Sequence, residues 1–104
     1  MNACTLALDQ GSHSSRAVLF DALGAPVASA HVPVGSHREG DDRVEQEPWE
    51  LLQSLRTAAL DACDAEAARG LPIRGAGLAT QRSTIVCWER STGRALTEAI
   101  SWQD

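Results

Sequence analysis

Short apolar runs alternate with polar turns over the first third of the chain. Residues 4–8 form one apolar run, residues 16–20 form a second, and residues 27–34 alternate loosely between apolar and polar side chains. Runs of this length between Asp, Gly and Ser residues are typical of strands joined by tight turns. Pro33 suits an edge strand, because proline cannot donate to a central ladder. The pattern therefore predicts an antiparallel three-strand meander.

The spacing becomes helical after Pro48. Apolar or small residues then recur at steps of three and four, at Leu52, Leu55, Ala59, Cys63 and Ala67. Pro48 suits the first helical position, whereas Gly70 and Pro72 stop a helix. These signals predict a helix of about 22 residues, about 33 Å long. The preceding residues, 35–47, are mostly polar or charged and predict a solvated loop.

Three more short runs follow the helix. Residues 73–80 are Gly-rich and apolar, which predicts a fourth strand that runs parallel to the first because a helix connects them. Residues 84–88 and 99–102 predict two further strands, with a turn at residues 91–93. The expected fold class is α/β: one mixed sheet containing the meander, a crossover helix, the parallel fourth strand and a terminal hairpin.

Composition limits the range of partners. The chain has 104 residues, nine arginines, no lysine and a formal net charge of −5, and its arginines form no basic run. Nucleic acids and anionic membranes attract clustered positive charge, so neither is an expected partner. A chain of this length forms one small domain and buries about 60–65% of its unfolded surface.

The cysteines favour a reducing compartment. Cys4, Cys63 and Cys87 are odd in number and contain no C-x-x-C pair, which argues against a disulfide framework and a zinc site. We expect them to be small buried side chains. The first residues carry no basic segment followed by a long apolar one, so no signal peptide is predicted and the expected location is the cytoplasm.

One polar segment carries candidate chemistry. Residues 9–16 read DQGSHSSR and join the first two predicted strands. Gly11 permits a left-handed backbone, and consecutive N–H groups of such a turn bind anions. Asp9 could hold a water on Mg²⁺, and Arg16 could stabilise phosphate charge. The alternative is an ordinary hairpin with a surface arginine, and this segment alone favours that alternative.

Three further features change this balance. Residues 80–84 read TQRST after the fourth predicted strand, Gly93 lies in the following turn, and residues 100–104 read ISWQD. In order and separation, these segments and residues 9–16 resemble the N-terminal part of the FGGY carbohydrate kinases, closest to the glycerol kinase branch. That family carries DQGTTSSR, NQRET and WQD at these places. The stretch VEQEPW at residues 44–49 also resembles the family's entry to its first helix.

The resemblance implies a ribonuclease H-like, actin-type ATPase fold and phosphoryl transfer from ATP to a hydroxyl of a small polyol or sugar. It implies that Asp9 approaches Mg²⁺ through water and that Arg16 offsets charge during transfer. The implied phosphate-binding residues are those of the first loop: Asp9, Gly11, Ser12, His13, Ser14 and Arg16. On the substrate side, Arg82 and Ser83 would contact hydroxyls and the Trp102 ring would pack against carbon.

Two positions depart from the family pattern. Ser83 stands where glycerol kinases have glutamate, so a charged acceptor is replaced by a short neutral one, and glycerol itself stays open as substrate. His13 replaces threonine in the loop and adds bulk and a titratable ring. A larger polyol, a ketose or weaker nucleotide binding would fit these changes. Packing is the favoured role for Trp49 and Trp88, and Arg82 has the alternative of pairing with a carboxylate.

Length limits what the chain does by itself. The resemblance makes residues 1–104 an incomplete first domain, with the catalytic base in a missing portion and no catalytic residue in this chain, so we expect the isolated chain to be inactive. Uncovered surface should favour self-association through an apolar patch or an exposed strand edge. Two alternatives stay open: a non-catalytic actin-like binding or regulatory module, and a pentulose kinase of the same family. If the site is correct, Asp9, Gly11, Arg82 and Trp102 should open onto one edge of the sheet.

Overall fold

The computed structural model of the chain describes residues 3–40 and 43–101. Its elements are, in order, β1 (Cys4–Gln10), β2 (Ser14–Phe20), β3 (Pro26–Pro33), β4 (His37–Glu39), β5 (Arg43–Gln46), α1 (Pro48–Asp64), a 3₁₀ turn (Glu66–Ala68), β6 (Ile73–Thr80) and β7 (Ala99–Ile100). A four-stranded sheet has the order β3-β2-β1-β6, and a small sheet has the order β4-β5-β7. The meander is antiparallel and β6 runs parallel to β1. The predicted α/β fold is confirmed.

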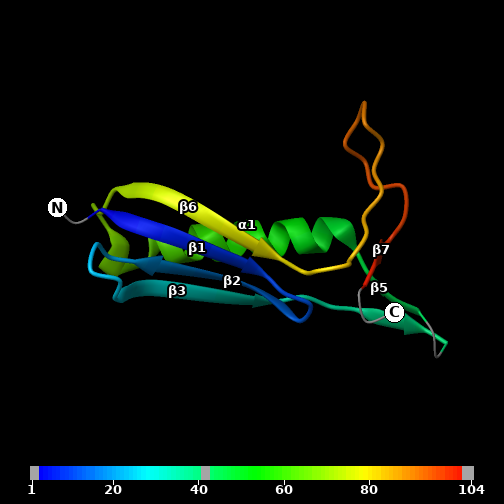
Figure 1. The fold of residues 1–104 in the computed structure, drawn as a ribbon, viewed down its shortest axis with the longest axis horizontal. Coiled ribbons are helices and arrows are strands. Elements are labelled where there is room, and N and C mark those ends of the chain that lie inside the picture. The colour runs from blue at the N-terminus through cyan, green and yellow to red at the C-terminus, as the bar shows by residue number, and fades with distance from the viewer. Residues whose placement is uncertain (1–2, 41–42, 102–104) are drawn as a thin grey trace.

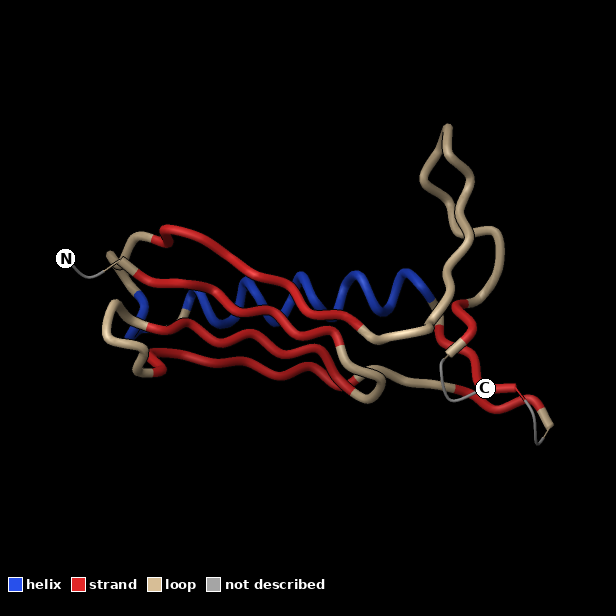
Figure 2. Tube along the Cα trace, viewed as in Figure 1, coloured by secondary structure: helices blue, strands red, loops and turns tan. Residues whose placement is uncertain are grey.

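The molecule is elongated. The four long strands lie side by side with α1 behind them, and the small sheet lies beyond one end of the long one (Figures 1 and 2). The radius of gyration is 15.8 Å, against about 13 Å for a compact domain of this length. The segment that follows β6 leaves the sheet, projects outward and returns as β7 (Figure 1). Among the described residues, no helix has the length and apolar character needed to cross a membrane.

Alternation along β2 divides the long sheet into two faces. Ser15, Ala17 and Leu19 are buried toward α1, whereas the intervening residues point to the opposite face, which we call the open face. Two alanines of α1 are fully buried against the sheet, and their small side chains allow close approach. The core cluster consists of Cys4, Leu6, Ala17, Leu19, Ala58, Ala62 and Ala68.

α1 packs mainly on β2 and β3 and leaves β6 uncovered. All eight residues of β6 are exposed, and the outer edge of this strand pairs with no strand among the described residues. The sheet therefore has one covered half and one uncovered half.

The helix begins as predicted but ends early. Pro48 lies in the first turn, and the Glu47 carboxylate accepts hydrogen bonds from the N–H groups of Trp49 and Glu50 at 3.1 and 2.7 Å. The predicted length of about 22 residues is wrong, because the helix has 17 and stops at Asp64. Ala65 adopts an extended backbone (ψ 143°), and the following 3₁₀ turn buries Ala68 in the core.

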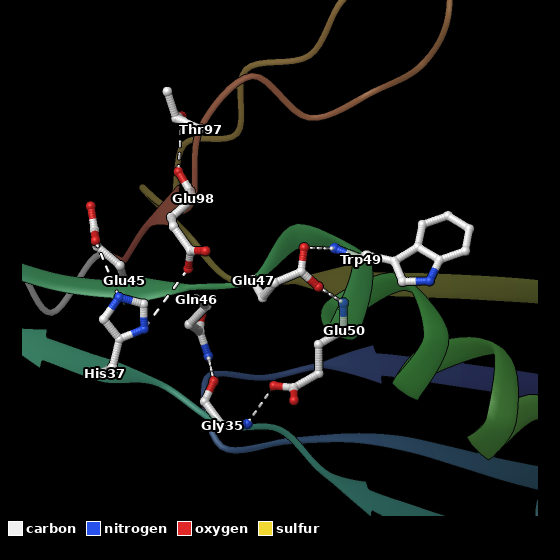
Figure 3. Close-up of polar contacts among 9 residues, drawn as sticks. All are labelled: Gly35, His37, Glu45, Gln46, Glu47, Trp49, Glu50, Thr97 and Glu98. Carbon is white, nitrogen blue, oxygen red and sulfur yellow. Dashed lines mark hydrogen bonds and ion pairs between the residues drawn. The ribbon is translucent and has the colours of Figure 1, made fainter.

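Residues 35–47 are not a simple loop. β4 and β5 form a short antiparallel hairpin within this stretch, and β5 also pairs with β7. The imidazole of His37 lies 3.3 Å from the Glu45 carboxylate and 3.8 Å from that of Glu98, so it links the hairpin to the segment before β7 (Figure 3). The predicted solvated loop is therefore wrong over these two strands, which long-range pairing stabilises.

The terminal hairpin is present but less regular than predicted. Residues 84–88 form no continuous strand and pair only through bridges from Ile85 to Ile100 and from Trp88 to Ala95. The second predicted strand, 99–102, shortens to β7 over the described residues, and Ser101 anchors its end by donating to the Val44 carbonyl at 2.9 Å.

Two packing predictions are wrong. Trp49 and Trp88 are 62% and 60% exposed, and both line an open, mainly apolar cleft of about 650 Å³ rather than filling a core. Of the three free cysteines, Cys4 is buried as expected and Cys63 is half-buried, but Cys87 is exposed. Trp49 lies in the first turn of α1, and Cys87 and Trp88 lie in the projecting segment, where the thin core offers little cover.

Candidate phosphate and substrate site

The candidate site lies where β1 and β6 end. The two parallel strands finish in register, with Gln10 beside Thr80. The loop of residues 11–13 follows β1, and the turn at Arg82 and Ser83 follows β6. Because carboxyl ends of parallel strands lie at the same edge of a sheet, the two predicted binding segments are neighbours.

The 11–13 loop is a tight connection between β1 and β2. The Gly11 N–H donates to the Ser14 carbonyl at 2.9 Å, and the Val34 N–H donates to the His13 carbonyl at 2.9 Å. The expectation that glycine serves a left-handed backbone at position 11 is wrong, because the φ of Gly11 is not positive. A Cβ added at Gly11 would lie 3.2 Å from the Ser14 carbonyl oxygen, so close approach of the backbone favours glycine here.

The exposure of the loop increases toward its tip. Gly11, Ser12 and Ser14 are half-buried, whereas His13 is exposed. Ser14 is already the first residue of β2. The arrangement presents small hydroxyl side chains and backbone N–H groups at the sheet edge, which suits an anion.

Asp9 and Arg16 are cross-strand partners on the open face. They stand opposite each other in the β1–β2 register, both are exposed, and Ala79 of β6 flanks Asp9 on its other side. A carboxylate and a guanidinium thus stand on neighbouring strands within three residues of the loop. The faces of β1 and β2 are fixed by the buried residues that alternate with them.

Arg82 and Ser83 form the turn after β6, and both are exposed. Ser83 has a φ of 61°, in the left-handed region that costs a non-glycine residue free energy. Trp102 lies outside the described residues.

Sequence reasoning missed three glutamines that connect these segments. Gln81 Nε2 donates to Gln10 Oε1, to the Gly11 carbonyl and to Gln46 Oε1, each at 3.1 Å. Gln46 is 1% exposed, and its Nε2 donates to the Ser12 carbonyl at 2.8 Å. The same nitrogen lies 3.4 Å from the carbonyl oxygen of Gly35. The N–H of Gly35 donates to the Glu50 carboxylate (Figure 3). The signal available was the position of Gln46 and Gln81 inside the two motifs VEQEPW and TQRST.

The residues present fit a Mg²⁺ ion held mainly by water and phosphate. No cluster of three or more potential ligands exists among the described residues, so the structure offers no all-protein cage. Mg²⁺ usually keeps several waters and uses one or two carboxylates plus substrate phosphates. Asp9 supplies one exposed carboxylate beside the loop, which suits that mode of binding.

Comparison with known proteins identifies the family. Residues 4–104 match the FGGY family of carbohydrate kinases, N-terminal domain. The chain is 39% identical over 101 residues to a glycerol kinase of Rhodospirillum centenum and 42% identical over 99 residues to one of Thermus brockianus. These alignments cover 97% and 95% of this chain but 20% of each relative, so the chain spans about a fifth of their length.

A solved structure agrees with this assignment. The glycerol kinase of Plasmodium falciparum with ADP matches with a TM-score of 0.89 at 24% identity, over 99% of this chain and 21% of that one. This likeness confirms the predicted ribonuclease H-like, actin-type fold. The match over residues 4–104 to the N-terminal domain of this family shows that the chain belongs to the FGGY family of carbohydrate kinases.

Proposed function

We propose that the complete protein carrying this chain is an ATP-dependent carbohydrate kinase that transfers the γ-phosphate to a hydroxyl of a small polyol or sugar. Membership of the FGGY family and the glycerol kinase relatives support this activity. The observation that carries the proposal is the placement of the 11–13 loop beside the Arg82–Ser83 turn, joined by Gln81. Phosphoryl transfer requires such neighbours, because the reacting atoms must meet at about 3–3.5 Å.

The loop and the open face would serve the nucleotide. In this proposal, N–H groups and hydroxyls of the loop residues Gly11, Ser12, His13 and Ser14 bind the ATP phosphates. Arg16 offsets charge that develops on the transferred group, and Asp9 orients a water of the metal ion. Mg²⁺, when bound with ATP, would neutralise phosphate charge. Such a site works by positioning and charge stabilisation rather than by covalent chemistry.

The turn after β6 would serve the acceptor. The exposed Arg82 guanidinium offers N–H donors for substrate hydroxyls, Ser83 lies beside it, and Trp102 is proposed to pack against the carbon skeleton. The base that receives the hydroxyl proton is expected from the four fifths of the relatives' length that this chain does not span. The isolated chain is accordingly expected to be inactive.

Location and partners belong to the same proposal. Three free cysteines, one of them exposed, are typical of a reducing compartment, which supports the cytoplasm. The net charge of −5 supports a small-molecule substrate rather than nucleic acid or an anionic membrane.

A substrate panel tests the activity. The complete protein is incubated with MgATP and, separately, with glycerol, larger polyols and ketopentoses, and ADP release is measured. Turnover of a polyol supports the proposal. Preference for a ketopentose would move it to the pentulose alternative, and no turnover or ATP binding would favour the non-catalytic module.

Replacing Ser83 with glutamate should raise kcat/KM for glycerol about tenfold. A carboxylate forms stronger hydrogen bonds to hydroxyls than a serine does, by about 1–1.5 kcal/mol. The left-handed backbone at φ 61° is already borne by serine, so glutamate adds little strain. Ser83→Gly, which relieves that strain without adding an acceptor, is the control. Efficient glycerol turnover that the glutamate leaves unchanged would contradict the argument.

The isolated chain should self-associate through β6. The outer edge of this strand is open among the described residues, and exposed Ile73 and Leu78 lie along it. Unpaired strand edges with apolar side chains promote association. Sedimentation velocity should show concentration-dependent dimers or larger species, and Leu78→Lys should reduce them. A monomer at all concentrations would contradict this expectation.

A further inference from the structure

Every carbonyl of the 11–13 loop accepts a hydrogen bond. The Gly11 oxygen accepts from Gln10 Nε2 at 2.9 Å and from Gln81 Nε2 at 3.1 Å. The Ser12 oxygen accepts from Gln46 Nε2 at 2.8 Å, and the His13 oxygen accepts from the Val34 N–H at 2.9 Å. Two of the three carbonyls are therefore fixed by side-chain amides from distant parts of the sequence.

Fixing a carbonyl also fixes the next N–H group. The peptide unit is planar and trans, so the N–H of the following residue points to the opposite side. Bonds to the Gly11 and Ser12 carbonyls therefore turn the N–H groups of Ser12 and His13 away from the two glutamines. Neither N–H donates to another group within the described residues. Both stay available to a ligand at the sheet edge.

The orientation of each amide follows from its neighbours. Carbonyl oxygens only accept, so the atoms facing the Gly11 and Ser12 carbonyls must be the Nε2 atoms of Gln81 and Gln46. Gln46 Oε1 then accepts from Gln81, and Gln81 Oε1 accepts from the Thr84 hydroxyl at 2.8 Å. A directed chain of hydrogen bonds runs from Thr84 through Gln81 and Gln46 to the Ser12 carbonyl.

The bonds of Gln46 are well protected. Its side chain is 1% exposed and comes from β5, which the small sheet and the Glu47 cap hold at the start of α1 (Figure 3). Water cannot easily replace a lost donor at a buried position, so breaking these bonds leaves carbonyls unpaired. The loop orientation therefore depends on an amide at this position.

We propose that Gln46 and Gln81 are positioning residues, whose side-chain amides hold the Gly11 and Ser12 carbonyls and thereby aim the Ser12 and His13 N–H groups at the nucleotide phosphates. Through its bond from Thr84, Gln81 also ties the phosphate loop to the Arg82–Ser83 turn. The proposal rests on the proposed kinase function. In it, neither glutamine touches the substrate, and both act by orienting the backbone of the 11–13 loop.

The test replaces an amide by a carboxylate of the same shape. In the complete protein, Gln46→Glu and Gln81→Glu place an oxygen against the loop carbonyls in place of a donor. The KM for ATP should rise at least tenfold for each variant, while the inhibition constant of adenosine, which has no phosphate, stays within twofold. Gln81→Met, which removes the donors without adding charge, should give a smaller rise in the same direction. Gln53→Glu on α1 makes the same exchange away from the loop and should change neither constant.

Other outcomes separate this proposal from its premise. An unchanged KM for ATP in both carboxylate variants, or equal weakening of ATP and adenosine, would overturn the positioning role. If the unaltered protein neither binds ATP nor phosphorylates a polyol, the proposed function fails. In that case a crystal structure of Gln46→Glu still decides the inference: rotated peptide planes at residues 11–13 support it, and unchanged planes overturn it.

Discussion

Replacing Arg16 with glutamine should lower the kcat of the phosphoryl transfer proposed for the complete protein by about 10²–10³-fold, which is the usual loss when one group that stabilises transition-state charge is removed. Arg16 is exposed on the open face, opposite Asp9 and three residues after the last residue of the 11–13 loop. Its guanidinium can therefore reach phosphate oxygens without giving up a packing role. The KM for ATP should change much less than kcat, because the role proposed for Arg16 is to offset charge that develops during transfer.

A matched control separates catalysis from general charge effects. Arg74 is also an exposed strand arginine, but it lies at the opposite end of β6, about 20 Å along the strand from Thr80. Arg74→Gln should leave steady-state kinetics unchanged. The melting temperature should be the same for both variants, because neither side chain is buried. Equal activity of Arg16→Gln and the unaltered protein would show that the open face does not carry the transferred group.

The long sheet was predictable because its signals are local. Apolar runs and the turn residues between them mark β1, β2 and β3, and Pro48 marks the start of α1. The helix end was harder to predict, because Ala65 and Ala67 carry no helix-stopping signal. There the burial of Ala68 in the core decides the path of the chain.

The small sheet was not predictable from pattern. β4 and β5 consist mostly of polar and charged residues, which read as a solvated loop. β5 also pairs with β7, more than fifty residues later in the chain, and such long-range pairing leaves no periodic trace in a short segment.

The candidate site was predictable only in its outer layer. Asp9, Arg16 and Arg82 stand in recognisable motifs, and the structure places their segments at one edge of the sheet. The hydrogen bonds among Gln10, Gln46 and Gln81 could not be predicted, because these residues are separated by 35 positions or more. A glutamine side chain also has no local sequence pattern that reveals its partner. Gly11 is a similar case, since its close neighbour is a backbone oxygen rather than a turn requirement.

The largest loss of stability is expected from Leu19→Ala. Leu19 is 1% exposed, lies between Leu6 of β1 and Ala28 of β3, and belongs to a core made mostly of small side chains. Truncating a buried leucine costs about 2–5 kcal/mol, from lost burial and from the cavity left behind. A small domain has a total stability of about 5–15 kcal/mol, so a large share would be lost. Urea unfolding of the chain should show a midpoint lower by about 1–3 M.

Leu23→Ala is the matched control, because the same truncation at a 94% exposed leucine should leave the urea midpoint nearly unchanged. A midpoint shift for Leu19→Ala no larger than the control's would contradict the assigned core. The same residue also fixes the site, since Leu19 and Ala17 face α1 and thereby keep Arg16 on the open face. Under conditions where the Leu19→Ala form of the complete protein remains folded, its KM for ATP should therefore match that of the unaltered protein. The loss of packing in Leu19→Ala would then lower stability without moving Arg16, whereas Arg16→Gln is expected to lower activity without lowering stability.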